Sequence, residues 1–153
     1  EVGALSSGQM GAVTTEFPVI DNKMNLWIHP PRTYTFKILE LCPFPFQYID
    51  ESVKKWGWNL GVGGFYLDPR WINQKERIQI SYEYLRAKDE TLTTPFGKII
   101  CKVTNGTAKS DLQNGMLRTH LKSYYHPKYG FVKLEYSTIN GSKIVMNLIE
   151  MKE

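Results

Sequence analysis

Aromatic side chains carry the clearest chemical signal in this sequence. Trp56 and Trp58 stand two positions apart, so on a β-strand their rings project to the same side, about 6.5–7 Å from each other. A sugar ring or an acyl chain could rest on two rings at this spacing. We predict a ligand site lined by Trp56, Trp58, Tyr66 and Tyr82, and the residues that would extend it are Trp27, Trp71, Tyr124 and Tyr125. The alternative is that these rings only fill the interior of the fold.

The common catalytic and metal-binding motifs are missing from the sequence. It contains no G-x-S-x-G string, and His29, His120 and His126 form neither an H-x-H nor an H-E-x-x-H pair. The glycine-rich stretch 61–64 is followed by a strand-like run and not by a helix, which argues against a phosphate-binding loop. We therefore predict a non-enzymatic protein without metal or other cofactor.

The two cysteines leave two readings open. Cys42 and Cys101 could form one disulfide in an oxidising compartment, or they could be two buried thiols. Cys101 falls on the apolar side of an expected strand, between Ile99 and Val103. This position favours a small buried side chain over a nucleophile activated by a histidine.

The elements that must position these residues are β-strands, because the dominant hydrophobic period is two. The clearest alternation is in residues 77–84, where Ile78, Ile80, Tyr82 and Tyr84 share one face. Residues 33–39 repeat the pattern, which predicts a strand with Tyr34, Phe36 and Ile38 pointing inward. Further strands are expected at 44–49, 56–66, 98–104, 116–125, 131–139 and 143–151.

Turn motifs separate several of these strands. Asn-Gly occurs at 105–106, 114–115 and 140–141, and each pair predicts a tight two-residue hairpin turn. Residues 126–130 predict a further turn, preset by Pro127. The C-terminal half is thus predicted to be a meander of sequential antiparallel strands, and the only helix signal is a short one after Asp68 and Pro69.

These patterns predict an all-β fold of about eight to ten strands with little helix. We expect a single strongly curved antiparallel sheet, forming a meander barrel or half-barrel, because the glycines of 56–66 allow that strand to bend. A two-sheet sandwich is the alternative. Residues 1–15 are small and weakly hydrophobic and are expected to form a flexible arm, ahead of a single β domain at 16–153.

Composition bounds the class of protein. The chain has 153 residues, a formal net charge of +4 and 42% hydrophobic residues, which is typical of one globular domain and excludes a disordered tail. No apolar run approaches the roughly 18 residues that span a bilayer. Basic residues never form a run longer than two, so we expect no nucleic-acid partner.

Several short strings of the sequence follow a familiar order: residues 28–33, 41–45, 56–58, 62–64, 94–97 with Cys101, 124–127 and 129–133. Taken together, they resemble a group of uncharacterised exported proteins and lipoproteins of Bacteroides-type bacteria. This resemblance implies a barrel-like fold and a periplasmic or cell-surface location, but it brings no activity and no catalytic residues. Because the chain opens at Glu1 with no leader and no lipid-attachment cysteine near it, we expect that any targeting segment has been removed, and membrane anchoring stays open.

Two functions follow from these expectations. The first is an exported domain that binds an apolar or amphipathic small molecule, lipid-like or carbohydrate, on an aromatic-lined concave face. The second is a structural or assembly protein of the cell envelope, which contacts a partner protein and whose aromatic residues are all core.

Overall fold

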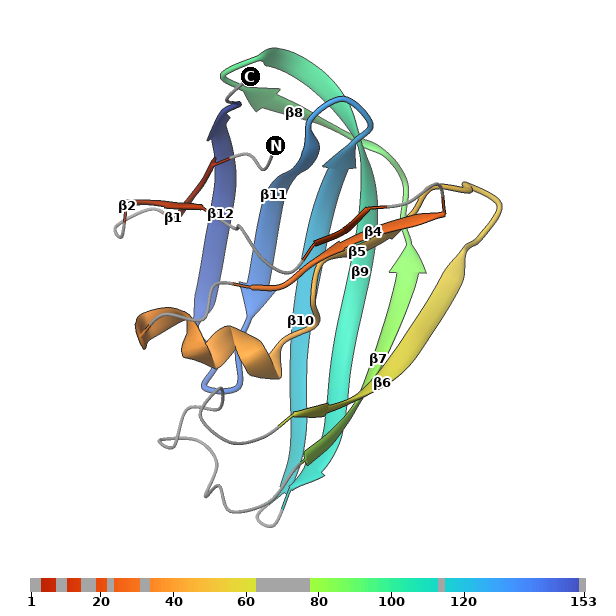
Figure 1. Cartoon of the computed structure of the whole chain (residues 1–153), viewed down its shortest axis with the longest axis vertical. Coiled ribbons are helices and arrows are strands. Elements are labelled where there is room, and N and C mark those ends of the chain that lie inside the picture. Colours follow the sequence, from red (N-terminus) through yellow and green to blue (C-terminus); the bar gives the residue numbers. More distant parts are fainter. Residues whose placement is uncertain are drawn as a thin grey trace.

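The computed structural model describes residues 4–7, 11–14, 19–21, 24–30, 34–62, 78–112 and 115–151. This part of the chain forms antiparallel strands and one short 3-10 helix (Figure 1). In chain order the elements are β1 (Ala4–Ser7), β2 (Gly11–Thr14), β3 (Val19–Asp21), β4 (Asn25–Ile28), η1 (Tyr34–Leu41), β5 (Phe46–Tyr48), β6 (Lys55–Val62), β7 (Ile78–Arg86), β8 (Glu90–Thr94), β9 (Gly97–Leu112), β10 (Gly115–His126), β11 (Gly130–Ser137) and β12 (Lys143–Glu150).

The larger sheet has the strand order β2-β1-β12-β11-β10-β9-β7-β6, and a small sheet has the order β3-β4-β5. The last four strands of the chain pair in sequence, so the predicted C-terminal meander is confirmed. Strand β9 is long enough to pair with β8 along its first part and with β7 along its later part. Within the predicted arm 1–15, the structure places β1 beside β12 and β2 beside β1.

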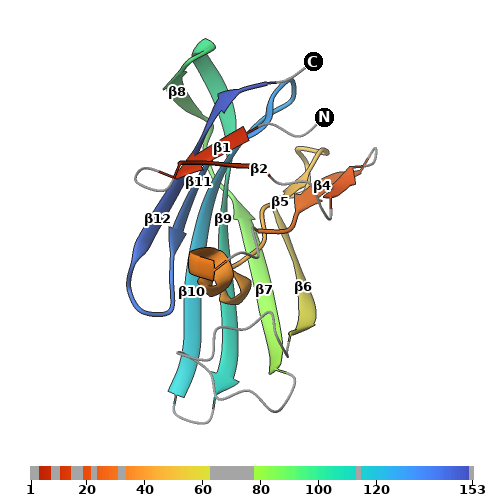
Figure 2. The ribbon, with the colours of Figure 1, turned by 60° about the vertical axis from the view of Figure 1, so that its left-hand side comes forward.

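The all-β, antiparallel prediction is confirmed, but no closed or strongly curled barrel is found. In the described part of the chain, β2 and β6 are the two edge strands of the larger sheet and do not pair with each other. The structure also has a second, smaller sheet, although a single sheet was predicted. The apolar face of the larger sheet is covered by η1 and the small sheet (Figure 2). A second layer can bury such a face as effectively as curling the sheet onto itself.

Strand β7 follows the predicted alternation. Ile80, Tyr82 and Tyr84 are at most 3% exposed, while Ser81 and Glu83 between them are exposed. Strand β6 pairs with β7 in register and turns Trp56 to the same side. The period-two signal therefore located both strands and their buried faces correctly.

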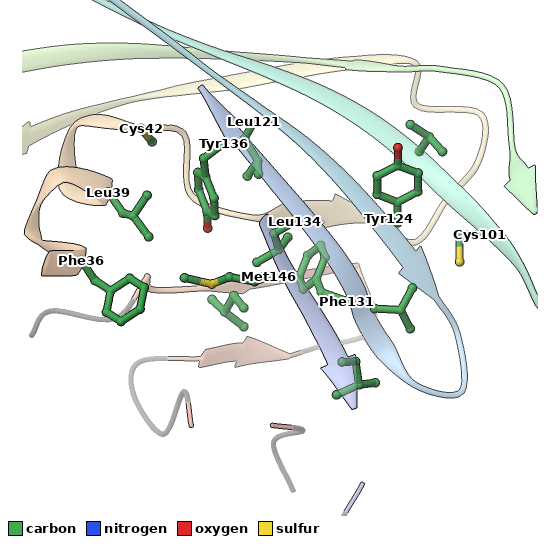
Figure 3. Close-up of a cluster of buried hydrophobic side chains, with 14 of the residues drawn as sticks. Phe36, Leu39, Cys42, Cys101, Leu121, Tyr124, Phe131, Leu134, Tyr136 and Met146 are labelled. Atoms are coloured by element: carbon green, nitrogen blue, oxygen red, sulfur yellow. The ribbon is translucent and has the colours of Figure 1, made fainter. Parts of the chain in front are cut away.

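The strand predicted at 33–39 is wrong, because residues 34–41 form the helix η1. Ile38 and Leu39 are adjacent and both buried, whereas a strand with one solvent face would expose one of them. Phe36 and Leu39 reach the apolar side chains of β11 and β12, where Tyr136 and Met146 face them (Figure 3). The helix thus buries positions of both parities against one sheet.

Two of the predicted turns are confirmed. The link between β11 and β12 turns at Gly141, whose φ is +81°. Gly141 N–H donates to the Thr138 carbonyl, and Thr138 N–H donates to the Ser142 carbonyl, so the loop has three residues where two were predicted. The turn at 126–130 is present and ends at Gly130 with φ +77°. Asn114 lies outside the described residues, although β9 ends at Leu112 directly opposite Gly115.

The turn predicted at Asn105-Gly106 is wrong, because both residues lie inside β9. A Cβ atom on Gly106 would lie 3.0 Å from Pro43 Cβ and 3.0 Å from Tyr84 Cε1. Glycine is therefore explained here by close packing and not by a turn.

The two cysteines are free and buried. They lie at opposite ends of the core cluster under η1 (Figure 3), so the reading as two thiols is confirmed and the disulfide is not formed. Burial raises the pKa of Cys42 to about 12, and burial together with the nearby Asp89 charge raises the pKa of Cys101 to about 11.

We expect both thiols to resist modification in the folded protein. At pH 8 roughly one part in a thousand of Cys101 would be thiolate, and less of Cys42. Because folding raises both pKa values from 9.0, the stability linked to these thiols is retained below pH 9.0 and falls as pH rises towards about 11 for Cys101 and about 12 for Cys42. The measurement is the rate of reaction with a chromogenic disulfide reagent at pH 8. Two thiols per chain should react with the reagent in guanidinium, and almost none should react in the folded protein. Fast release of the chromophore by the folded protein would contradict the prediction.

Candidate functional site

Eight aromatic side chains meet between the small sheet and strands β6 and β7. We call this set the aromatic cluster, and its members are Trp27, Phe44, Phe46, Tyr48, Trp56, Trp58, Tyr82 and Tyr84. Three of the four predicted site residues belong to it. The fourth, Tyr66, lies outside the described residues, as does Trp71.

Strands β6 and β7 set the floor of the aromatic cluster. The register places Trp56 opposite Tyr84 and Trp58 opposite Tyr82. The rings of Trp56 and Tyr84 are stacked with centroids 5.9 Å apart, and those of Trp58 and Tyr82 are tilted with centroids 5.7 Å apart. The alternation seen in the sequence therefore brings these four rings together on one face.

The small sheet supplies the covering layer. The Trp27 ring centroid lies 5.4 Å from that of Trp58, and the Tyr48 centroid lies 5.3 Å from that of Trp56. Phe46 contacts the floor rings as well, with centroids 5.7 Å from Trp58 and 5.5 Å from Tyr84. The described rings of the two layers thus pack against one another.

Of the described residues that were expected to extend the site, Trp27 joins the aromatic cluster and Tyr124 and Tyr125 do not. Tyr124 is buried in the other core cluster, against which Tyr125 packs. The ammonium groups of Lys122 and Lys133 lie 5.1 Å and 5.4 Å from the centroid of the Tyr124 ring. Tyr124 and Tyr125 therefore belong to a different part of the core from the aromatic cluster.

Unpaired hydrogen-bond donors are concentrated at the aromatic cluster. Among the described residues, five buried side-chain atoms lack a hydrogen-bond partner, and four of them are in or beside it: Trp56 Nε1, Trp58 Nε1, the Tyr82 hydroxyl and Arg86 Nη1. Trp58 Nε1 lies close enough to the Tyr84 hydroxyl to lower the pKa of Tyr84, but without hydrogen-bond geometry. Because buried polar atoms in folded proteins are nearly always paired, these four call for an explanation.

The Tyr84 hydroxyl is buried as well, but it has a hydrogen-bond partner. It donates to the Phe44 carbonyl across 2.7 Å. The Tyr82 hydroxyl is on the same strand, 3% exposed, and has no such partner. Burial raises the pKa of Tyr82 far above its ordinary value, with smaller contributions from Tyr84, Glu40 and Cys42, so this hydroxyl stays protonated and able to donate.

Arg86 fixes one end of the aromatic cluster. Its Nε donates to the Val53 carbonyl across 3.0 Å, and its Nη2 donates to the carbonyls of Tyr48 and Asp50 across 2.9 Å and 3.1 Å. The guanidinium carbon lies 5.4 Å from the centre of the Trp56 ring, a cation–π contact. Within the described part of the chain no carboxylate lies at ion-pair distance from Arg86. The guanidinium ties the loop after β5 to the end of β7.

A buried His29–Glu40 pair borders the aromatic cluster. The His29 ring lies 4.6 Å from the Phe44 ring, and His29 Nε2 is 3.1 Å from Glu40 Oε1. His29 Nδ1 lies 2.7 Å from the Pro30 carbonyl, which can only accept, so Nδ1 carries a proton. His29 Nε2 faces the Glu40 carboxylate. Both ring nitrogens are therefore engaged, and the pair joins η1 to the chain after β4.

Sequence reasoning missed the covering layer and its anchors. The strand expected at 44–49 has aromatic residues at alternate positions, Phe44, Phe46 and Tyr48, so their shared face could have been predicted. Arg86 continues the parity of Tyr82 and Tyr84, which also placed it on the buried side. The pairing of His29 with Glu40 left no local signal.

The described residues show neither a metal-binding cluster nor a membrane-spanning helix. No group of three or more His, Cys, Asp or Glu side chains gathers there to hold a metal ion. The same part of the chain has no helix with the length and apolar character needed to cross a bilayer. No protein-family model, curated protein or solved structure matches the chain.

Proposed function

We propose that this chain is a non-enzymatic, exported domain that binds an apolar or amphipathic small molecule at the aromatic cluster. The observation that carries the proposal is the gathering of unpaired buried donors at Trp56, Tyr82 and Arg86. All of them can donate, so the fitting ligand has an apolar body and a hydrogen-bond acceptor. The resemblance to exported bacterial proteins supports a periplasmic or cell-surface location.

Ligand entry must separate rings that are in contact. The Tyr48 and Trp56 centroids are 5.3 Å apart, so a ligand would have to displace the small sheet from β6. Such a movement changes the surroundings of Trp56 and Trp58, and their fluorescence would report it directly.

The test is native mass spectrometry of the purified chain, followed by titration with dodecanoate while tryptophan emission is recorded. We expect a co-purifying mass, or binding of dodecanoate at least about tenfold tighter than that of dodecyltrimethylammonium, which has the same tail and no acceptor. Equal affinity for the two amphiphiles would reject the proposed ligand chemistry, and so would the absence of binding by both.

Two variants examine the role of the unpaired hydroxyl. Tyr82→Phe removes a hydroxyl without a partner, so it should leave stability unchanged or raised but weaken dodecanoate binding about tenfold. Tyr84→Phe removes the donor to the Phe44 carbonyl and should cost about 1–3 kcal/mol of stability without that loss of affinity. Denaturant unfolding and the same titration separate the two effects. If Tyr82→Phe binds dodecanoate normally, the hydroxyl does not contact the ligand.

The second candidate function is a structural or assembly protein of the cell envelope. Mutual contact of the eight rings favours it, because a filled aromatic core needs no ligand. A protein without bound mass and with no response to either amphiphile would support this function over ligand binding.

A further inference from the structure

The larger sheet has a groove on the face that points away from η1 and the small sheet. Its volume is about 540 Å³, and it crosses strands β9, β10, β11 and β12. The floor is formed at Gly106, Leu121 and Tyr136. The side chains of Leu121 and Tyr136 are buried in the core, so these residues offer the groove their backbone, and their sequence neighbours project into it.

A row of four polar residues runs along the groove. Strand pairing places Thr107 beside His120, His120 beside Ser137, and Ser137 beside Lys143. Thr107 Oγ1 lies 3.3 Å from His120 Nδ1. The row therefore presents two hydroxyls, an imidazole and an ammonium group side by side.

The neighbouring residues on β10 and β11, Lys122 and Glu135, do not cover this polar row. Lys122 and Glu135 are direct neighbours across β10 and β11, yet neither pairs with the other. Lys122 Nζ turns to Glu90 at 2.7 Å, and the Glu135 carboxylate turns to Lys133 at 2.8 Å. Because both long side chains are engaged away from the polar row, the space above Thr107, His120 and Ser137 stays open.

The local charge of the groove is positive. On this face Glu83, Glu90 and Glu135 each form an ion pair with a lysine. Lys143 lines the groove, and within the described residues no carboxylate lies at ion-pair distance from it. A ligand with negative charge would meet an ammonium group that is not already neutralised.

We propose that this groove binds a hydroxylated carboxylate of the uronic acid type. Lys143 and His120 would face the carboxylate, while the hydroxyls of Thr107 and Ser137 would exchange hydrogen bonds with the hydroxyls of the sugar ring. The volume of about 540 Å³ lies within the usual range for small-molecule sites. This site is separate from the aromatic cluster and does not depend on the function proposed above.

The experiment is a titration of the isotope-labelled chain with glucuronate, followed by amide chemical-shift changes in NMR spectra, with glucose and inorganic phosphate as comparison ligands. We expect shifts confined to residues of the groove, a Kd of roughly 1 mM, and binding of glucose and phosphate each about tenfold weaker. Phosphate binding equal to that of glucuronate would overturn the saccharide assignment. Shifts centred on Trp56 and Tyr82 would overturn the location, because they mark the aromatic cluster.

A matched pair of lysine variants completes the test. Lys143→Gln should weaken glucuronate binding about fivefold, since it removes the cation and keeps a polar side chain. Lys109→Gln removes a lysine of β9 that does not line the groove, and it should leave the affinity unchanged. Equal loss in both variants would show general charge attraction and would overturn the proposal.

Discussion

Replacing Glu40 by alanine is expected to destabilise the protein by about 3–5 kcal/mol. Glu40 and His29 are 2% and 3% exposed, and His29 Nε2 lies 3.1 Å from the carboxylate. Without Glu40, the buried His29 ring loses the carboxylate that lies 3.1 Å from Nε2, and breaking a buried pair by removing one member is strongly destabilising. Denaturant unfolding at neutral pH measures the change in the free energy of unfolding.

The control is an exposed ion pair that also contains a glutamate. Lys55 Nζ lies 2.8 Å from Glu83 Oε1, and the two side chains are 64% and 49% exposed. Glu83→Ala should change stability by less than about 1 kcal/mol, because water and salt screen such pairs. A double variant, His29→Phe with Glu40→Leu, should recover at least half of the loss caused by Glu40→Ala. Equal costs for Glu40→Ala and Glu83→Ala would show that the buried pair contributes no more than a surface one.

Leu39→Ala is the second substitution with a large expected effect, about 2–5 kcal/mol. Leu39 is 0% exposed and packs in the core cluster beneath η1. Truncation removes apolar contacts and leaves a cavity between the helix and the sheet. The measurement is again denaturant unfolding. An unchanged slope of the free energy of unfolding against denaturant concentration would show that the unfolded state is unaltered.

The same substitution distinguishes the helix from the strand that the alternation predicted. In a strand with Phe36 and Ile38 inward, Leu39 would face solvent beside Lys37, and its truncation would cost little. Lys37→Ala is therefore the internal control, expected within about 0.5 kcal/mol of the parent protein. A cost below about 1 kcal/mol for Leu39→Ala would contradict the packing of η1 on the sheet.

The aromatic cluster divides between what was predictable and what was not. Trp56 and Trp58 were predicted to share a face, because residues two apart on a strand do so whatever the rest of the chain does. That Tyr82 lies opposite Trp58 depends on the pairing of β6 with β7. That these rings are covered by Phe46 and Tyr48 was not predicted. The covering depends on which strand the second layer packs against, and no local pattern carries that information.

The sequence by itself determined the all-β class, the C-terminal meander and the buried faces of β6 and β7, because these depend on period-two alternation and on turns at Gly130 and Gly141. Only the tertiary structure decided three other features. Residues 34–41 became a helix, since the sheet beneath them buries both Ile38 and Leu39. Gly106 lies within a strand because β9 pairs with β7 and β10 there, and Pro43 and Tyr84 occupy the space that a side chain would need. The larger sheet stayed open because a second layer covers its apolar face, and contacts between residues far apart in the chain settle that choice.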